Sequence, residues 1–137
     1  MQGPEHTIEL FHGYTYSAHP LACAAGLAAL DLYRDETLFE RVRRLEPFFA
    51  DAAMTLQGLP NVLDIRTVGF AAGVDLASRP GAVGERGYEA MERAFHDEDL
   101  VIRITGDTLA IAPPLIASEA EISEIFEKVG RVIRAMA

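Results

Sequence analysis

A run of hydroxyl-bearing residues just before a predicted helix start is the first candidate for binding chemistry. The run HGYTYSAHP occupies residues 12–20, and its hydroxyl-bearing members are Tyr14, Thr15, Tyr16 and Ser17. Pro20 suits the first turn of a helix, where the N–H that proline lacks would have no partner. Hydroxyls and free backbone N–H groups near a helix start suit a phosphate. Serine and threonine are also ordinary helix caps, so the pattern alone leaves both interpretations open.

The second candidate is Arg103, an arginine within the apolar run VIRIT. If this run is a strand, Ile102 and Ile104 point to one face, and Arg103 points to the other. An unpaired buried charge is costly, so Arg103 needs an anionic partner. A guanidinium binds a carboxylate through two parallel hydrogen bonds. The partner is either an acid of the same chain, in a structural ion pair, or the carboxylate of a ligand.

Lys128 is the only lysine of the chain. A lysine amine can form a Schiff base with a carbonyl compound, which makes any lysine worth testing. Lys128 lies about a quarter turn from the centre of the apolar stripe of the last predicted helix. Its neighbours on the polar side are Glu124, Glu127 and Arg131. We therefore interpret Lys128 as a solvated surface residue.

Metal binding and carboxylate catalysis have no support in the sequence. The histidines lack metal-ligand spacing with cysteines or acids, and they are His6, His12, His19 and His96. We interpret His19 as part of the helix start and His96 as a surface residue. No pair of acids is placed for acid–base work.

Composition excludes several classes of function. The chain has 137 residues, half of them hydrophobic, which is enough for a domain with a real core. Its net charge of −9 argues against binding to nucleic acid or to an anionic membrane. No apolar run has the length of a membrane span, and the N-terminal residues lack the pattern of a secretory signal. Cys23, the single cysteine, lies among alanines and is interpreted as a small buried thiol. A cytoplasmic protein fits these features.

Hydrophobic periodicity predicts two helices in the first part of the chain. Residues 20–33 are rich in Ala and Leu on every face, as in a helix that is buried on all sides. One domain of this size rarely encloses a helix, so we expect this helix to pack against a surface outside the chain. Asp35 is the expected N-cap of the second helix. Pro47 is expected to kink that helix or to split it in two.

The remainder predicts two hairpins and two more helices. Leu63, Ile65 and Thr67 alternate with polar residues, which is typical of a strand with one wet face, and residues 72–77 form its partner. A helix over residues 85–97 follows, then strands over 100–104 and 108–112 joined by a turn. In the last helix, Ser118 is the N-cap and Glu121 completes a capping box. The predicted class is α+β, with helices on one face of a small antiparallel or mixed sheet.

The sequence resembles the class III pyridoxal-phosphate aminotransferases, and most closely the ω-amino acid–pyruvate (β-alanine–pyruvate) aminotransferases. The resemblance is carried by residues 11–47, which begin FHGYTYSAHP, by GFAAGVDL at 69–76 and by RITGDTLAIAPP at 103–114. It extends over essentially the whole chain. It implies that residues 35–137 are the small C-terminal α+β domain of a fold-type I enzyme. Residues 1–34 would then be a cofactor-phosphate segment and a buried helix from the end of the large domain.

The resemblance also implies roles for three residues. Thr15 would bind the phosphate of pyridoxal 5'-phosphate in the neighbouring subunit, and Tyr14 would line that neighbour's substrate pocket. Arg103 would bind the α-carboxylate of the substrate and swing aside for a substrate that lacks one. In the family pattern the Schiff-base lysine lies upstream of Thr15, and Lys128 does not correspond to it. We therefore predict no catalytic residue within this chain, and no activity for the isolated chain.

The implied reaction transfers an amino group from an ω-amino acid or an amine to pyruvate, in a homodimeric enzyme. Two interpretations of the chain remain. It is either the C-terminal segment of such a transaminase, natural or made on purpose, or a free-standing, non-catalytic α+β domain. A free-standing domain would bind a small ligand or a partner protein. Neither interpretation involves nucleic acid or a membrane.

Overall fold

The computed structural model describes residues 13–137, which fall into two compact units. One unit ends at Glu36, and the other runs from Thr37 to Ala137. The described part of the first unit is one turn followed by a helix. The second contains three helices and the sheet. No helix within the described residues is both long enough and apolar enough to cross a membrane.

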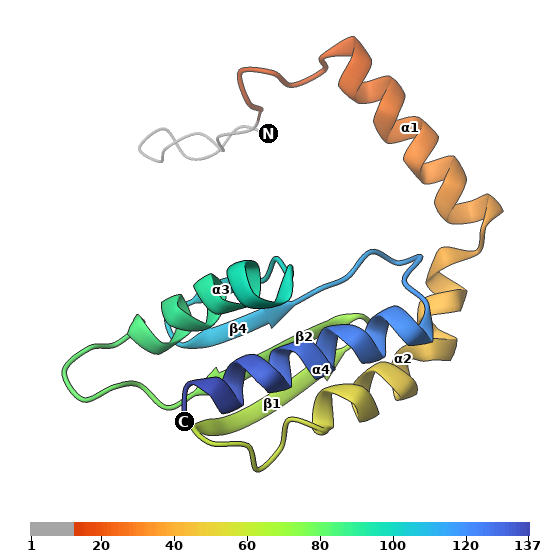
Figure 1. Ribbon diagram of the computed structural model, residues 1–137. Helices are drawn as coiled ribbons and strands as arrows, with labels where there is room; N and C mark the ends of the chain where they lie inside the picture. The colour runs from red at the N-terminus through yellow and green to blue at the C-terminus, as the bar shows by residue number, and fades with distance from the viewer. Residues whose placement is uncertain (1–12) are drawn as a thin grey trace, which may run out of the picture. The chain divides into compact units, whose positions relative to one another are not determined.

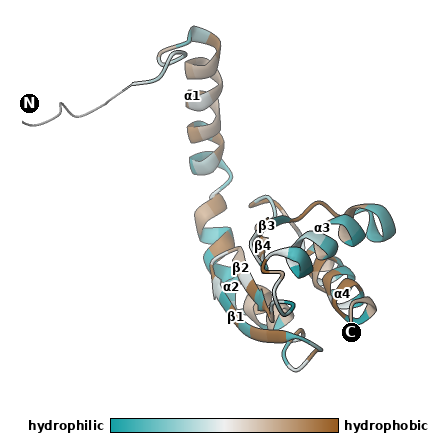
Figure 2. Cartoon of the chain, turned by 90° about the vertical axis from the view of Figure 1, so that its left-hand side faces the viewer, coloured by the Kyte–Doolittle hydropathy of each residue, from teal (hydrophilic) through white to brown (hydrophobic). Residues whose placement is uncertain are grey.

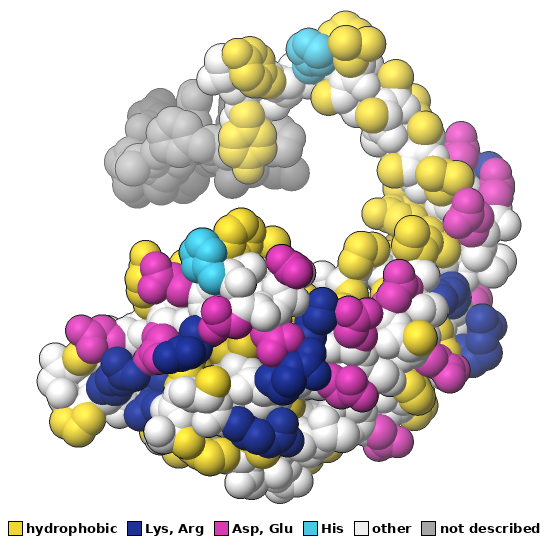
Figure 3. Space-filling view, in the orientation of Figure 1, with side chains coloured by type: hydrophobic (Ala, Val, Ile, Leu, Met, Phe, Trp, Pro, Cys, Tyr) yellow, Lys and Arg dark blue, Asp and Glu magenta, His cyan; other side chains and the backbone are white. Residues whose placement is uncertain are grey.

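Helix α1 (Pro20–Asp35) begins as the sequence predicts. Pro20 occupies its first turn, and the imidazole of His19 caps it by accepting a hydrogen bond from the N–H of Ala22 at 3.4 Å. No residue of α1 is buried, and Leu21 is 77% exposed. Figure 3 shows hydrophobic side chains at the surface along this helix. Cys23 is exposed as well, so its interpretation as a buried thiol is wrong for this chain.

Helix α2 (Leu38–Met54) differs from the prediction at its start and at Pro47. Asp35 belongs to the last turn of α1, where Arg34 forms an ion pair with its carboxylate at 2.9 Å. Thr37, in the left-handed conformation, is the N-cap instead of Asp35. The helix continues through Pro47 and is not split there. Phe49, which is fully buried, fixes the second half of α2 against the core.

The sheet of the second unit has four strands in the order β1-β2-β4-β3, and every neighbouring pair is antiparallel. In chain order the elements are β1 (Val62–Val68), β2 (Ala71–Leu76), α3 (Glu85–Glu98), β3 (Arg103–Thr105), β4 (Thr108–Ile111) and α4 (Glu119–Ala135). Figure 1 shows the helices of this unit gathered on one face of the sheet. The predicted α+β class and the predicted order of elements are confirmed, and the sheet is antiparallel, not mixed.

Strand β1 contains an irregularity that the sequence did not predict. The register with β2 shifts between Val62 and Asp64, as in a β-bulge. Leu63 is consequently 71% exposed, while Val62 and Ile65 pack against the core. A strict alternation that places Leu63 on the inner face is therefore wrong at the start of this strand.

The core lies between the helices and the covered face of the sheet. Phe49 stacks on Phe70 at a centroid distance of 5.4 Å and meets Phe126 edge-on at 5.1 Å. The predicted capping box of α4 is confirmed: the carboxylate of Glu121 accepts from the N–H of Ser118 at 2.7 Å, and the Ser118 hydroxyl accepts from the N–H of Glu121. Local side-chain chemistry therefore fixes the start of the helix that packs on α2 and α3.

Candidate substrate-carboxylate and cofactor-phosphate sites

Arg103 begins an edge strand of only three residues. Its partner strand is β4, with Arg103 opposite Ala110 and Ile104 opposite Leu109. Leu109 is fully buried beneath the helices, which places Arg103 on the opposite, open face of the sheet. Arg103 is exposed and Ile102 is buried. The predicted division of VIRIT between two faces is thus confirmed.

The guanidinium of Arg103 is available for an external partner. Among residues 13–137 it forms no hydrogen bond and no ion pair. The structural ion pair that the sequence left open is therefore not formed within this part of the chain.

The acids on the same open face are already engaged. Arg66 grips Asp75 through two hydrogen bonds of 2.6 and 3.1 Å, and it also reaches Asp64 at 3.4 Å. The hydroxyl of Thr108 donates to Asp75 at 2.7 Å. These bonds, chiefly those from Arg66, hold the pKa of Asp75 below its usual value. An anion approaching this face would find Arg66 neutralised and the charge of Arg103 uncompensated.

Small residues separate these two arginines along one cross-strand row. The register places Arg66 opposite Gly73, Gly73 opposite Ala110, and Ala110 opposite Arg103. The side chain of Arg66 lies over Gly73, since a Cβ on that glycine would be 3.3 Å from Nε and Cζ of the guanidinium. Arg66 therefore covers the β2 position of this row, and no bulky side chain lies beside Arg103 on β4.

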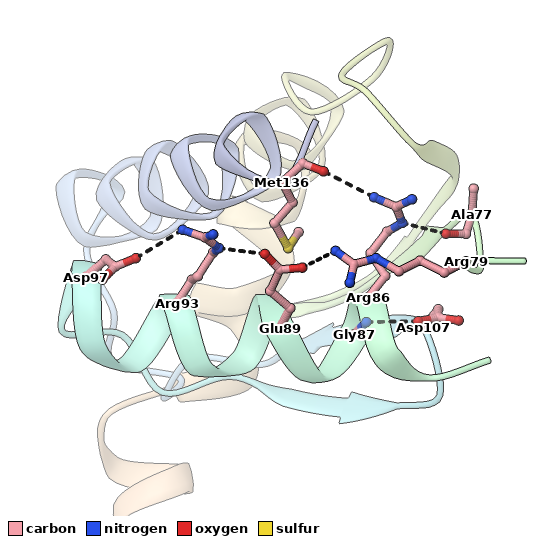
Figure 4. Close-up of polar contacts among 9 residues, drawn as sticks. All are labelled: Ala77, Arg79, Arg86, Gly87, Glu89, Arg93, Asp97, Asp107 and Met136. Carbon is pink, nitrogen blue, oxygen red and sulfur yellow. Dashed lines mark hydrogen bonds and ion pairs between the residues drawn. The ribbon is translucent and has the colours of Figure 1, made fainter. Parts of the chain in front are cut away.

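The hairpin that carries Arg103 is anchored by Asp107, a residue that the sequence analysis missed. Its carboxylate accepts from the Ser78 hydroxyl at 2.6 Å and from the N–H groups of Gly84 and Gly87, both at 2.8 Å. Figure 4 shows the contact with Gly87 at the start of α3. Burial alone would raise the pKa of Asp107, but the hydroxyl and backbone hydrogen bonds outweigh it and hold the pKa below its usual value.

Close packing reinforces this anchor. A Cβ on Gly87 would lie 2.1 Å from the carbonyl oxygen of Gly106, so only glycine fits between the helix and the turn. The other inward residues of α3 are the small Ala90 and Ala94, and Figure 2 shows this helix mostly in hydrophilic colours. The sequence signal that could have revealed the contact is the Gly106-Asp107 turn, because a buried aspartate there requires several donors.

Polar contacts along α3 hold this helix to the rest of the second unit. Arg86 donates to the carbonyl oxygens of Ala77 at 2.7 Å and Met136 at 3.2 Å. Figure 4 also shows Glu89 between two arginines, Arg79 and Arg93. These contacts link the loop after β2 and the end of α4 to the helix on which the Arg103 hairpin rests.

The predicted phosphate-binding residues lie in a turn before α1, in the first unit. The N–H of Ser17 donates to the carbonyl oxygen of Tyr14 at 2.9 Å, and the Ser17 hydroxyl accepts from the N–H of Tyr14 at 2.7 Å. Thr15 is exposed, and its hydroxyl bonds to no other described residue. Tyr14 is 88% exposed. The turn therefore uses the serine hydroxyl internally and presents the threonine outward.

Lys128 is less solvated than the sequence predicted. Its side chain is only 21% exposed, and its ammonium forms an ion pair with Glu124 at 2.9 Å. It borders a pocket of about 340 Å³ that Leu100, Pro113 and Ile116 also line. The stem of a lysine is often covered by apolar neighbours in this way while its charge reaches a partner. Lys128 is thus paired, and it lies far in sequence from both predicted binding segments.

The remaining predicted residues show no metal centre. His19 caps α1, as expected of a helix-start residue, and His96 is exposed. His6 and His12 lie outside the described residues. Within residues 13–137, no group of three or more histidines, cysteines or acids is arranged to hold a metal ion.

The family follows from comparison with known proteins. Residues 2–133 match the model of the class-III aminotransferases. The chain belongs to this family, as its resemblance implied.

Individual relatives agree with this assignment. The chain is 50% identical over 133 residues to an omega-aminotransferase of Caulobacter vibrioides, and 41% identical over 134 residues to the beta-alanine–pyruvate aminotransferase of Pseudomonas aeruginosa. These alignments include 97% and 98% of this chain, but the chain spans only 30% of the length of either relative. The fold is similar to a thermostable omega transaminase mutant from Pseudomonas jessenii, with a TM-score of 0.82 and 30% identity over 93% of this chain and 30% of the other.

Proposed function

We propose that this chain is the C-terminal segment of a pyridoxal-phosphate-dependent transaminase that moves an amino group from an ω-amino acid or an amine to pyruvate. Family membership and the names of the similar relatives support the reaction class. The observation that carries the proposal is the free guanidinium of Arg103, on a sheet face whose acids are already bound by Arg66. A pyruvate carboxylate is the kind of anion that this guanidinium would bind.

In this proposal Arg103 binds and orients the carboxylate of pyruvate or alanine. Because Arg103 is exposed and unpaired, binding does not require an existing ion pair to break. The side chain is also free to swing aside when the substrate is an amine without a carboxylate. Tyr14 would form part of the wall of a substrate pocket. Its side chain is almost fully exposed, so it is free to contact a substrate.

The described residues suit the phosphate of the proposed cofactor, but they do not supply the lysine that holds it. The outward hydroxyl of Thr15, on a turn before a helix N-terminus, suits a phosphate oxygen. The ion-paired Lys128 does not suit the role of the lysine that holds the cofactor. When bound, pyridoxal phosphate supplies the electron sink on which transamination depends. This chain would supply the phosphate and carboxylate contacts, and the isolated chain would be inactive.

The proposal extends to assembly and location. Residues 1–34 would belong to a large cofactor domain and residues 35–137 to the small domain of a homodimer, with Thr15 reaching the partner's cofactor. The exposed leucines of α1 support this proposal, because other parts of such an enzyme would cover them. A single cysteine and no membrane-spanning helix in residues 13–137 fit a cytoplasmic enzyme.

The test is a chimera in which residues 2–133 of this chain replace the matching segment of the Caulobacter omega-aminotransferase. Arg103→Ala removes a charge-assisted pair worth roughly 1.5–3 kcal/mol, so kcat/KM for pyruvate should fall about tenfold to a hundredfold. The half-reaction of a carboxylate-free amine should change much less. Arg43→Ala, on the exposed side of α2, is the control and should affect neither. Equal losses for both substrates after Arg103→Ala would show that Arg103 is only structural.

A further inference from the structure

Asp107 connects three elements of the second unit. Its backbone carbonyl accepts from the N–H of Leu76, at the end of β2, at 2.9 Å. Its carboxylate binds the Ser78 hydroxyl and the backbone donors at the start of α3. At 8% exposure it is the one charged residue that is buried within the described part of the chain. So many donors around one buried carboxylate fix its position closely.

The strand that carries Arg103 is hydrogen-bonded on one side only, although Ile102 and Ile104 pack against the core. β3 contributes three residue pairs to the sheet, all of them to β4, and it lies at the edge. Short edge strands move more readily than central ones, because only one side is hydrogen-bonded. The turn between β3 and β4 is where the hairpin meets α3, since Gly87 touches Gly106 there. Asp107 occupies this turn, four residues after Arg103.

We propose that Asp107 is a positioning residue for Arg103: by fixing the β3–β4 turn to the start of α3, it sets the direction in which the guanidinium leaves the sheet. This proposal rests on the proposed carboxylate-binding role of Arg103. Catalysis requires the substrate to be held to well within about 1 Å of its reactive position. A loosened hairpin would shift by roughly 1 Å, which exceeds that tolerance. A free arginine on a fixed strand is preorganised, whereas the same arginine on a mobile strand must be ordered by the substrate.

The experiment is a double-mutant cycle in the same chimera, with pyruvate and a carboxylate-free amine measured separately. Asp107→Asn keeps the size of the side chain but places an amide nitrogen against N–H donors. We expect it to lower kcat/KM for pyruvate about tenfold, mainly through KM, and to change the amine half-reaction less than about twofold. In an Arg103→Ala background, Asp107→Asn should have less than about a twofold effect on pyruvate, because the residue through which it acts is gone.

Glu46→Gln is the matched control. Glu46 also holds a hairpin, but through one hydrogen bond: its carboxylate accepts from the N–H of Gly69, in the β1–β2 turn, at 2.8 Å. Glu46→Gln should lower the melting temperature, but it should change kcat/KM for pyruvate and for the amine by the same factor. Should Asp107→Asn fail to fold, Ser78→Ala removes one of the donors to Asp107 and should show the same selectivity at about threefold.

The outcomes separate the two proposals. Suppose that Arg103→Ala selectively lowers kcat/KM for pyruvate, but that Asp107→Asn lowers it by the same factor with and without Arg103. Asp107 then does not act through Arg103, and the positioning role is wrong. Equal losses for pyruvate and amine after Asp107→Asn would likewise make it only structural. If Arg103→Ala itself shows no selectivity, the carboxylate-binding role fails first, and the positioning role fails with it.

Discussion

Replacing Gly87 by alanine should strongly destabilise the second unit. The new Cβ would lie 2.1 Å from the carbonyl oxygen of Gly106 and 3.1 Å from the Cα of Asp107, and both are backbone atoms that cannot rotate away. Helix and turn must separate by about 1 Å, which costs roughly 1–3 kcal/mol as overpacking. The movement also weakens the hydrogen bond from Gly87 to Asp107, worth about 1.5–3 kcal/mol. Alanine recovers about 1 kcal/mol of helix propensity, which leaves a net loss of stability of roughly 1.5–5 kcal/mol.

The control for this substitution is Gly130→Ala in α4. Its Cβ would meet Arg134 Nη1 at 3.3 Å, the end of a flexible side chain, and Leu56 at 3.4 Å. It gains the same helix propensity without a backbone clash, so the free energy of unfolding should change by less than about 1 kcal/mol. Urea denaturation followed by circular dichroism measures both variants. Equal stability of the two alanine variants would refute the account of the α3–hairpin contact.

Three further predictions concern the chain itself. The isolated chain with added pyridoxal phosphate should form no alanine from pyruvate and β-alanine, and turnover that disappears in Lys128→Ala would contradict this. Exposed α1 should drive self-association that Leu21→Glu with Leu27→Glu relieves, and sedimentation showing a monodisperse unmutated monomer at high concentration would argue against it. Folding lowers the pKa of Asp107 from its ordinary value of 3.8. The stabilisation of the folded state by this carboxylate is therefore complete above the pKa of the unfolded chain, and it is lost as the pH falls through the lower pKa of the folded chain. The unmutated chain should therefore lose more stability than Asp107→Asn as the pH falls below about 4, and parallel losses would show that this carboxylate is not involved.

The features that the sequence predicted well are those encoded within a few residues. The Ser118–Glu121 capping box needs only a spacing of three, and the two faces of the Arg103 strand need only alternation. The features that it missed depend on residues distant in the chain. The bulge beside Leu63 follows from pairing with β2, and the burial of Asp107 follows from donors 20 or more residues away.

The candidate site shows the same division. The sequence identified Arg103 by its type within an apolar strand, but it left the choice of partner open. The hydrogen bonds of the structure show that Arg66, and not Arg103, binds Asp75 and Asp64. The exposure of Cys23 differs from the prediction because no residue of α1 is buried in this chain.

The central claim is that this chain supplies working substrate and cofactor contacts to a transaminase. The most direct test is the activity of the unmutated Caulobacter chimera with β-alanine and pyruvate, after cofactor loading has been confirmed from its absorbance. The account predicts alanine formation that depends on the chimera and that falls when Thr15→Ala weakens retention of pyridoxal phosphate. A chimera that loads the cofactor and forms a dimer, yet produces no alanine with either β-alanine or a simple amine as donor, would contradict it.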